Sequence, residues 1–252
     1  MNKYLKKKKC FSYEVHEKRF HSVVMEIIEF ICIVILLFMG FFIYDTLMVK
    51  KSAKVDNYYK EYKPVIDKVT HKASLSELQE LNPDVIAWIT MDDTSIDYPI
   101  LHNGANYSYI NRNLKGESSL TGSLYTDVLS DRYFHDDYTV VYGHHMEGGM
   151  MLGSLEYYRK EDYLQEHLTG TLIAEDKVYD LTALALLQVD AYDKIYQRTT
   201  MSAFDTFKGD TTRYEVLSGT IEVDYDKLLI LSTCYGGGMD RLILILRMEE
   251  RK

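Results

Sequence analysis

A run of fifteen consecutive residues without a charge, at positions 30–44, constrains this 252-residue chain more than any other feature of its sequence. Extended back to Ile27, the run has eighteen residues, and Glu29 is its one charged interruption. A helix that crosses a membrane needs about 20 mostly apolar residues. The stretch 27–49 is therefore predicted to be a transmembrane helix, with Glu29 near the lipid headgroups.

Two other interpretations of this run are weaker. A cleaved signal peptide ends in a small-residue cleavage site, and none follows the run. A buried core helix is rarely apolar on all sides beside a polybasic end such as residues 3–9. An uncleaved signal-anchor accounts for both features.

Charge is divided unevenly about the apolar run. Residues 1–50 hold eight Lys and Arg against five Asp and Glu, a net of +3, and the other 202 residues hold a net of −12. Because basic flanks stay in the cytoplasm, residues 1–26 are predicted to be a cytoplasmic tail of a single-pass membrane protein, with the rest extracellular. Lys50, Lys51 and Lys54 oppose this orientation without reversing it. The acidic bulk also argues against binding of nucleic acid, which needs clustered Lys and Arg.

The segment 50–81 is predicted to form juxtamembrane helices. Apolar residues recur at three- and four-residue steps over 55–69, as in an amphipathic helix, and Pro64 is expected to kink it. Ser74 and Glu77 have the spacing of a capping box before a second, shorter helix.

From residue 82 to residue 252 the sequence predicts a mostly β domain with flanking helices, of the α+β class. Short β-like runs are broken by turn residues, at 85–90, 96–101, 122–126, 139–142, 178–189, 227–233 and 242–246. Strands at this spacing favour a closed or nearly closed β-barrel, because an acidic β domain must hide its strand edges. Residues 151–167 and 201–217 are predicted to be helical.

The three cysteines exclude a disulfide scaffold, which needs an even and dense set. In the predicted topology Cys10 is cytoplasmic, Cys32 lies in the membrane and Cys234 alone is exported. A single exported thiol is either an inert core residue or a reactive group.

Two apolar strands end in residues that can carry chemistry. The first leads into His144 and His145, the second ends at Cys234, and a glycine-rich turn then leads to Arg241. A nucleophilic cysteine needs a positive neighbour and a proton donor, which a histidine provides. It also needs a group that holds the oxyanion, a task that suits the planar fork of an arginine. Each of these residues taken alone is more often structural.

The paired histidines also raise the question of a metal site. Adjacent residues on a strand point to opposite faces, so His144 and His145 do not readily bind one ion together. The sequence has no H-E-x-x-H motif and no Cys/His cluster. We therefore predict neither a metal nor a cofactor.

Several motifs together resemble the sortases, and specifically class B. They are Y-G-H-H at 142–145, L-S-T-C at 231–234 and Arg241 seven residues later. Supporting marks are N-P-D at 82–84 with Trp88, I-D-Y-P-I at 96–100 and G-S at 122–123. The resemblance covers about residues 75–248. It implies a sortase-type β-barrel.

The resemblance implies a cysteine transpeptidase on the surface of a Gram-positive bacterium. Cys234 would cleave a sorting motif near the C-terminus of a secreted protein and form a thioester. An amine of a peptidoglycan precursor or a pilin lysine would resolve that thioester. His144 would act as acid and base and Arg241 would brace the substrate and the oxyanion, while His145 is interpreted as structural.

The resemblance also implies four contacts around the substrate. Ser232 would orient the arginine, Tyr142 would line the site, and Tyr196 would lie where the family reads the sorting motif. The backbone N–H of Tyr235 would add an oxyanion donor. No residue matches a calcium site, and the short turn 235–239 with its three glycines leaves the motif preference open.

Three other functions remain as alternatives. A papain-like protease places its histidine after the cysteine, whereas His144 precedes Cys234 by ninety residues. An L,D-transpeptidase-like cell-wall enzyme has its nucleophile in an S-x-G-C motif, and residues 232–234 lack that glycine. A non-catalytic surface adaptor that keeps the sortase fold is the third.

Overall fold

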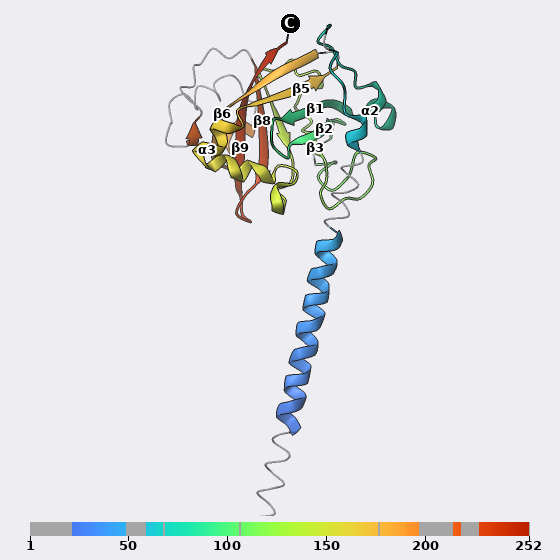
Figure 1. The fold of residues 1–252 in the computed structure, drawn as a ribbon, viewed down its shortest axis with the longest axis vertical. Coiled ribbons are helices and arrows are strands. Elements are labelled where there is room, and N and C mark those ends of the chain that lie inside the picture. The colour runs from blue at the N-terminus through green and yellow to red at the C-terminus, as the bar shows by residue number, and fades with distance from the viewer. Residues whose placement is uncertain are drawn as a thin grey trace, which may run out of the picture. The chain divides into compact units, whose positions relative to one another are not determined.

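The computed structural model describes residues 22–48, 59–67, 69–105, 107–175, 177–196, 214–217 and 227–251, and the chain forms two units, Met1–Lys51 and Ser52–Lys252. The described part of the first unit is one helix, Ser22–Met48, drawn in blue in Figure 1. Its 27 residues are long and apolar enough to cross a membrane, and none of its apolar window is buried. A helix with these properties serves as a membrane anchor or as a signal sequence.

The second unit is a β-barrel with short helices (Figure 1). Its described strands are β1 Val85–Met91, β2 Asp97–Leu101, β3 Leu124–Thr126, β4 Tyr138–Tyr142, β5 Thr169–Ala174, β6 Lys177–Asp190, β7 Tyr214–Leu217, β8 Leu228–Cys234 and β9 Asp240–Glu250. They pair in the order β5-β1-β2-β3-β4-β8-β9-β6-β7, and β5 also pairs with β6. Eight strands thus close into a barrel, with β7 as an extra strand on β6. The prediction of a closed barrel is confirmed.

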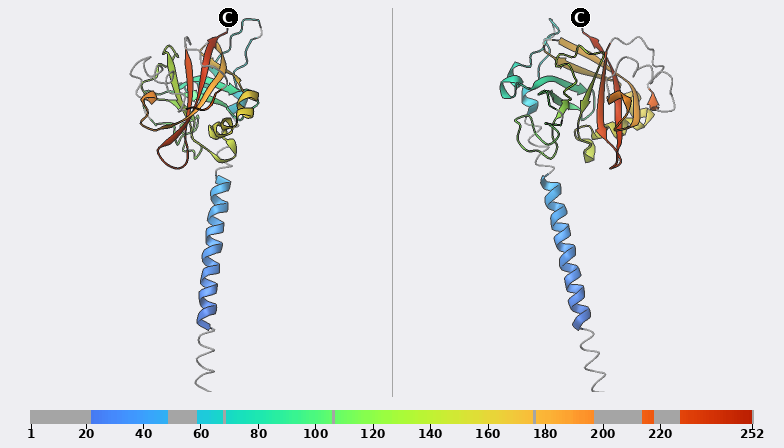
Figure 2. Two further views of the ribbon diagram at one scale, coloured as in Figure 1. Left: turned by 90° about the vertical axis from the view of Figure 1, so that its left-hand side faces the viewer. Right: turned by 180° about the vertical axis from the view of Figure 1, so that it is seen from behind.

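The strands β8 and β9 are apolar on both faces because each face packs against a different cluster. Leu229 and Leu231 of β8 belong to the cluster that also holds β1 and β5 side chains, whereas Leu228 and Ile230 pack into a second cluster with β6. Successive residues of a strand point to opposite faces. The near-continuous apolar run of β8 follows from burial on both sides. In Figure 2 the red strands β8 and β9 lie side by side and join in a turn.

The N-terminal helices differ from the prediction. Within the described part of residues 55–69, helix is confined to the 3-10 turn η1 Tyr59–Tyr62, and residues 63–67 are not helical. Pro64 explains this end, because proline lacks an N–H and disfavours helical backbone at the residue before it. The second helix, α2 Ser76–Leu81, is present, but it starts at Ser76 with no side-chain cap. The Ser74 hydroxyl instead accepts the Ser76 N–H at 3.2 Å, so no capping box forms.

The remaining helices are η2 Glu147–Gly149, η3 Gly153–Arg159, α3 Glu161–Glu166 and η4 Lys194–Tyr196. Helix was correctly predicted over 151–167, where η3 and α3 follow each other. It was wrong at the end of 201–217, where β7 pairs with β6, and residues 201–213 lie outside the described part. Strand β5 was not predicted, although it pairs with both β1 and β6 and closes the barrel. Such pairing overrides local preference.

Asp97 at the start of β2 ties the segment after η1 to the barrel. Its carboxylate accepts hydrogen bonds from Lys63 Nζ at 2.7 Å, Trp88 Nε1 at 2.9 Å and Thr90 Oγ1 at 3.0 Å. Burial by itself raises the pKa of Asp97, but these bonds and the Lys63 charge outweigh it and hold the pKa below its ordinary value. The carboxylate therefore stabilises the fold while it is ionised.

We expect Asp97→Ala to lower the free energy of unfolding at pH 7 by about 2 kcal/mol, because the buried Trp88 N–H loses its acceptor. A carboxylate whose pKa is lowered on folding contributes its full stabilisation above its unfolded pKa of about 4, and this contribution is lost as the pH falls from there through the lower folded pKa. Urea unfolding followed by the fluorescence of the single tryptophan measures both. The exposed Glu80→Ala is the control and should change stability by less than about 0.5 kcal/mol. An equal loss at pH 3 and pH 7 would contradict the assignment.

Candidate active site

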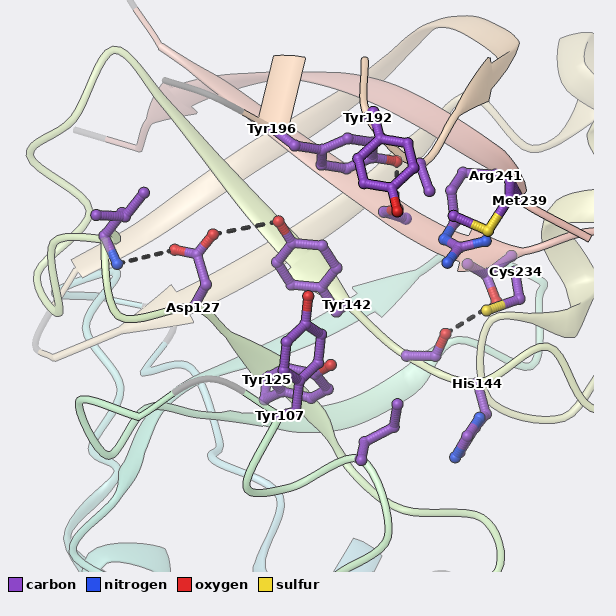
Figure 3. A pocket seen from close by; sticks show the side chains of 16 residues that line it. Tyr107, Tyr125, Asp127, Tyr142, His144, Tyr192, Tyr196, Cys234, Met239 and Arg241 are labelled. Carbon is purple, nitrogen blue, oxygen red and sulfur yellow. Dashed lines mark hydrogen bonds between the residues drawn. The ribbon is translucent and has the colours of Figure 1, made fainter. Parts of the chain in front are cut away.

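Three neighbouring strands carry the residues singled out in the sequence to one end of the barrel. Strands β4 and β8 run parallel, with Tyr142 opposite Ser232, and β8 and β9 run antiparallel, with Cys234 opposite Arg241. His144 follows β4 by two residues. His144, Cys234 and Arg241 all line one cavity of about 380 Å³ (Figure 3).

Cys234 and Arg241 lie together on one side of this cavity. Directly opposed residues of antiparallel strands place their side chains on the same face. Figure 3 accordingly shows the guanidinium close to the cysteine. Arg241 Nη1 donates to the backbone carbonyls of Asp240 at 2.9 Å and Gly238 at 3.5 Å, which hold the guanidinium over the turn. The Cys234 thiol is free and exposed, so it is not an inert core residue.

Gly143 joins the histidine segment to the cysteine strand. Thr233 Oγ1 donates to the Gly143 carbonyl at 2.8 Å, and the Gly143 N–H donates to the Ser232 carbonyl at 3.1 Å. A Cβ at this position would lie 2.4 Å from Leu124 Cδ2 and 3.0 Å from Leu152 Cδ1. A larger residue before His144 would therefore require the buried side chains of Leu124 and Leu152 to shift.

The His144 imidazole is half-buried and lines the same cavity as Cys234. Its Nε2 is 3.4 Å from Asn111 Oδ1, and in Figure 3 the ring is directed away from the sulfur. Burial lowers the pKa of His144 because it disfavours the imidazolium, although a hydrogen bond with the Ile110 backbone acts in the other direction. Catalytic hydrogen bonds often shorten only when substrate is bound. Asn111 was missed in the sequence, where nothing marks it as a partner of His144.

A wall of tyrosines forms another side of the cavity. The rings of Tyr125 and Tyr142 stack with centroids 5.6 Å apart, and Tyr142 and Tyr196 are 6.1 Å apart. The Tyr196 hydroxyl and Ser232 Oγ are 2.8 Å apart, so Ser232 bonds to the tyrosine rather than to Arg241. Burial raises the pKa of Tyr196 to about 12, which keeps the phenol neutral.

The structure brings Tyr142, Ser232 and Tyr196 into the cavity, and their contact with substrate stays a prediction. Several other lining residues come from loops that carry no sequence signal: Tyr107, Asp127, Leu129, Tyr192 and Met239. Asp127 accepts a hydrogen bond from the Tyr142 hydroxyl at 3.2 Å.

Tyr235 does not fit its predicted role. Its backbone N–H donates to the Asp240 carbonyl at 3.0 Å, so that N–H already has an acceptor. Its side chain contacts Arg159 and is not among the residues that line the cavity. An oxyanion donor at this position is not supported by the geometry.

The two histidines face different surroundings, as expected for adjacent residues. His144 lines the cavity, whereas His145 Nε2 lies 3.4 Å from Glu156 Oε2. In the part of the chain that the structure describes, no group of three or more His, Cys, Asp or Glu side chains could hold a metal ion.

No family model matches the chain, but curated proteins and solved structures do. It is 32% identical over 164 residues to a sortase B of Listeria monocytogenes and 25% identical over 236 residues to a sortase B of Staphylococcus aureus. The match to the L. monocytogenes protein covers 64% of this chain and 66% of that protein, so this chain spans just under two thirds of its length. The match to the S. aureus protein covers 89% of this chain and 96% of that protein.

The solved structures give the same family. A class B sortase of Streptococcus pyogenes involved in pilus biogenesis is 29% identical with a TM-score of 0.62, over 69% of this chain and 97% of that one. Two further sortase B structures share the fold at 21% sequence identity, and both alignments cover 82% of this chain. The S. aureus structure with a substrate has a TM-score of 0.64 over 95% of its chain. The structure with triglycine has a TM-score of 0.67 over 100% of its chain. The chain belongs to the class B sortases, a family of cysteine transpeptidases.

We expect the His144 imidazole to titrate below its midpoint in the urea-unfolded protein, because burial disfavours the charged ring. NMR titration of histidine-labelled protein measures both midpoints, and the resonance missing from His144→Gln assigns the signal. A folded midpoint at or above the unfolded one would contradict the burial argument.

Proposed function

We propose that this protein is a membrane-anchored transpeptidase that cleaves a C-terminal sorting motif of secreted proteins and transfers the product to an amine. The observation that carries the proposal is the convergence of Cys234, His144 and Arg241 on one cavity, in a chain of the class B sortase family.

In the first step His144 takes the proton of the Cys234 thiol, and the thiolate attacks the carbonyl carbon of the scissile peptide bond. Arg241 stabilises the oxyanion of the tetrahedral intermediate with its fixed positive charge. The intermediate collapses as the C–N bond breaks and His144 gives its proton to the departing amine. The product is a thioester on Cys234.

In the second step an acceptor amine attacks the thioester. His144 accepts the proton that the amine loses, the Cys234 thiolate leaves as the new amide bond forms, and His144 returns the proton to the thiolate. The lowered pKa of His144 supports this step, because it keeps the imidazole neutral and able to accept a proton. The reaction exchanges one amide bond for another.

The tyrosines that line the cavity can bind an extended peptide. Tyr107 and Tyr192 are 68% and 77% exposed at the cavity, so they offer large apolar faces to an incoming chain. The related sortase B structures hold a substrate and triglycine, a peptide with a free amine. By analogy we assign a sorting-motif peptide as donor and a peptidoglycan amine or a pilin lysine as acceptor.

The helix Ser22–Met48 and the uneven charge support anchoring in the membrane of a Gram-positive cell. The basic residues 1–26 would stay in the cytoplasm, and the acidic barrel would face the cell surface. The barrel would then meet secreted proteins and cell-wall amines on the same side of the membrane.

We expect the full-length chain to cleave members of a panel of sorting-motif peptides when an amine nucleophile is present. Cys234→Ala should lower turnover by roughly 1,000-fold or more, because the thioester cannot form. His144→Ala should have a comparable effect, whereas His145→Ala should reduce turnover modestly. Mass spectrometry of cleaved and transferred peptide measures these rates. Equal turnover by Cys234→Ala would indicate a different function, such as a surface adaptor, and the opposite ranking of the histidines would reverse their roles.

We also expect Arg241→Lys to lower kcat by about tenfold or more although the charge is kept, because the planar fork of donors is lost. The matched control is Arg251→Lys, whose arginine pairs with Asp180 outside the cavity, and it should keep full activity. Wild-type turnover by Arg241→Lys would refute the oxyanion role.

A further inference from the structure

A second cluster lies beside the proposed catalytic residues, and the proposed chemistry does not use it. It consists of His145, Glu156, Arg159 and Tyr235, and we call it the Arg159 cluster. None of the four is among the residues that line the cavity. His145 and Tyr235 directly follow His144 and Cys234 in the chain.

The four side chains contact one another in series. The Arg159 guanidinium carbon lies 4.8 Å from the centroid of the Tyr235 ring, and Arg159 Nη1 donates a hydrogen bond to the Tyr235 hydroxyl. The His145 ring meets the Tyr235 ring at 6.4 Å in an edge-on arrangement. His145 Nε2 in turn lies 3.4 Å from Glu156 Oε2.

The helix η3 supplies both charged members of the cluster. Glu156 and Arg159 are three residues apart, and side chains at that spacing in a 3-10 helix project from the same face. Leu155 and Tyr158 on the neighbouring face are completely buried in the barrel core. The buried side chains thus hold η3 in place, while Glu156 and Arg159 contact His145 and Tyr235, which follow His144 and Cys234 in the chain.

The turn after Cys234 is held by backbone hydrogen bonds, from the Tyr235 N–H to the Asp240 carbonyl and from the Ala191 N–H to the Met239 carbonyl, but its glycines add no side-chain contact. Gly236, Gly237 and Gly238 follow Tyr235, and a Cβ added to any of them would meet no atom within 4 Å. Tyr235 is partly buried and packs against the barrel core. The position of Tyr235 therefore limits the freedom of the turn that joins the thiol to Arg241.

The segment that carries His144 and His145 is joined to the residues just before η3. The Leu152 N–H, just before η3, donates to the His144 carbonyl at 3.1 Å, and His145 forms an isolated bridge with Met151. The segment from Met151 to Arg159 thus contacts the backbone at His144 and His145 and, through Arg159, the side chain of Tyr235 next to Cys234. A misplacement of about 1 Å between reacting groups can cost roughly 100-fold in rate.

We propose that Arg159 and Tyr235 are positioning residues that hold the Cys234 thiol in register with His144 and Arg241 for transpeptidation. This inference rests on the proposed function. It assigns Tyr235 to the support of the nucleophile rather than to the substrate. A substrate contact would change KM, whereas a positioning role changes kcat and the reactivity of the thiol itself.

The test uses the purified full-length chain in mild detergent. Arg159→Met removes the cation and the donor but keeps an unbranched side chain, Arg159→Lys restores the charge, and Tyr235→Phe removes only the hydroxyl. The control is Arg251→Met, which removes an arginine outside both the cavity and the Arg159 cluster. Three readouts are compared: kcat and KM for a sorting peptide, the rate of Cys234 alkylation by iodoacetamide at several pH values, and Tm.

We expect Arg159→Met to lower kcat by about tenfold with KM within about twofold, and to change the alkylation rate of Cys234. Arg159→Lys should recover part of the loss, Tyr235→Phe should show a smaller loss, and Arg251→Met should match the wild type in kcat and alkylation. If Arg159→Met does not fold, Tyr235→Phe and Arg159→Lys decide the question by the same readouts.

Wild-type kcat and alkylation in the folded variants would overturn the positioning role. A rise in KM alone, or a loss no larger than that of Arg251→Met at equal Tm, would overturn it as well. If the wild-type chain transfers no peptide at all, the proposed function fails, while the alkylation rates still show whether the Arg159 cluster controls the thiol.

Discussion

The pairing of β8 with its two neighbours is the constraint on which the site depends. The parallel register with β4 brings the histidine segment level with the end of β8, and the antiparallel register with β9 sets Cys234 opposite Arg241. A shift of one residue in either ladder would turn the side chains of that strand to the opposite face. The hydrogen bonds between Gly143 and β8 hold the first register at its end.

The ends of strands β4, β8 and β9 carry two groups of side chains with different proposed roles. One side is a cavity in which a thiol, an imidazole and a guanidinium meet a wall of tyrosines. The other side holds the contacts of Arg159 with Tyr235 and of Glu156 with His145. Because adjacent residues of an extended segment point in opposite directions, His144 and Cys234 are each followed by a residue, His145 and Tyr235, whose side chain belongs to the Arg159 cluster. Burial lowers the pKa of His144 and raises the pKa of Tyr196, so both side chains are favoured in their neutral forms.

Local sequence patterns predicted most of the barrel but not its details. The apolar runs gave the correct strands around the site, because β8 and β9 are buried on both faces and the signal is strong. Strand β5 was not predicted, because it forms through its pairing with β1 and β6 rather than from a local apolar pattern. The local patterns also failed to predict the end of the first helix before Pro64 and the start of α2 at Ser76 without a side-chain cap. In each case a contact or a backbone restriction outweighed the periodic pattern.

The sequence by itself determined the apolar N-terminal helix, the closed barrel and the three residues proposed for the chemistry, because these depend on composition, periodicity and short motifs. Only the tertiary structure showed that Asn111 faces His144, that Ser232 bonds to Tyr196, and that Tyr235 is held by Arg159. Those pairs are separated by 33, 36 and 76 residues. Contacts over such distances follow from strand register and loop packing, which no local pattern encodes.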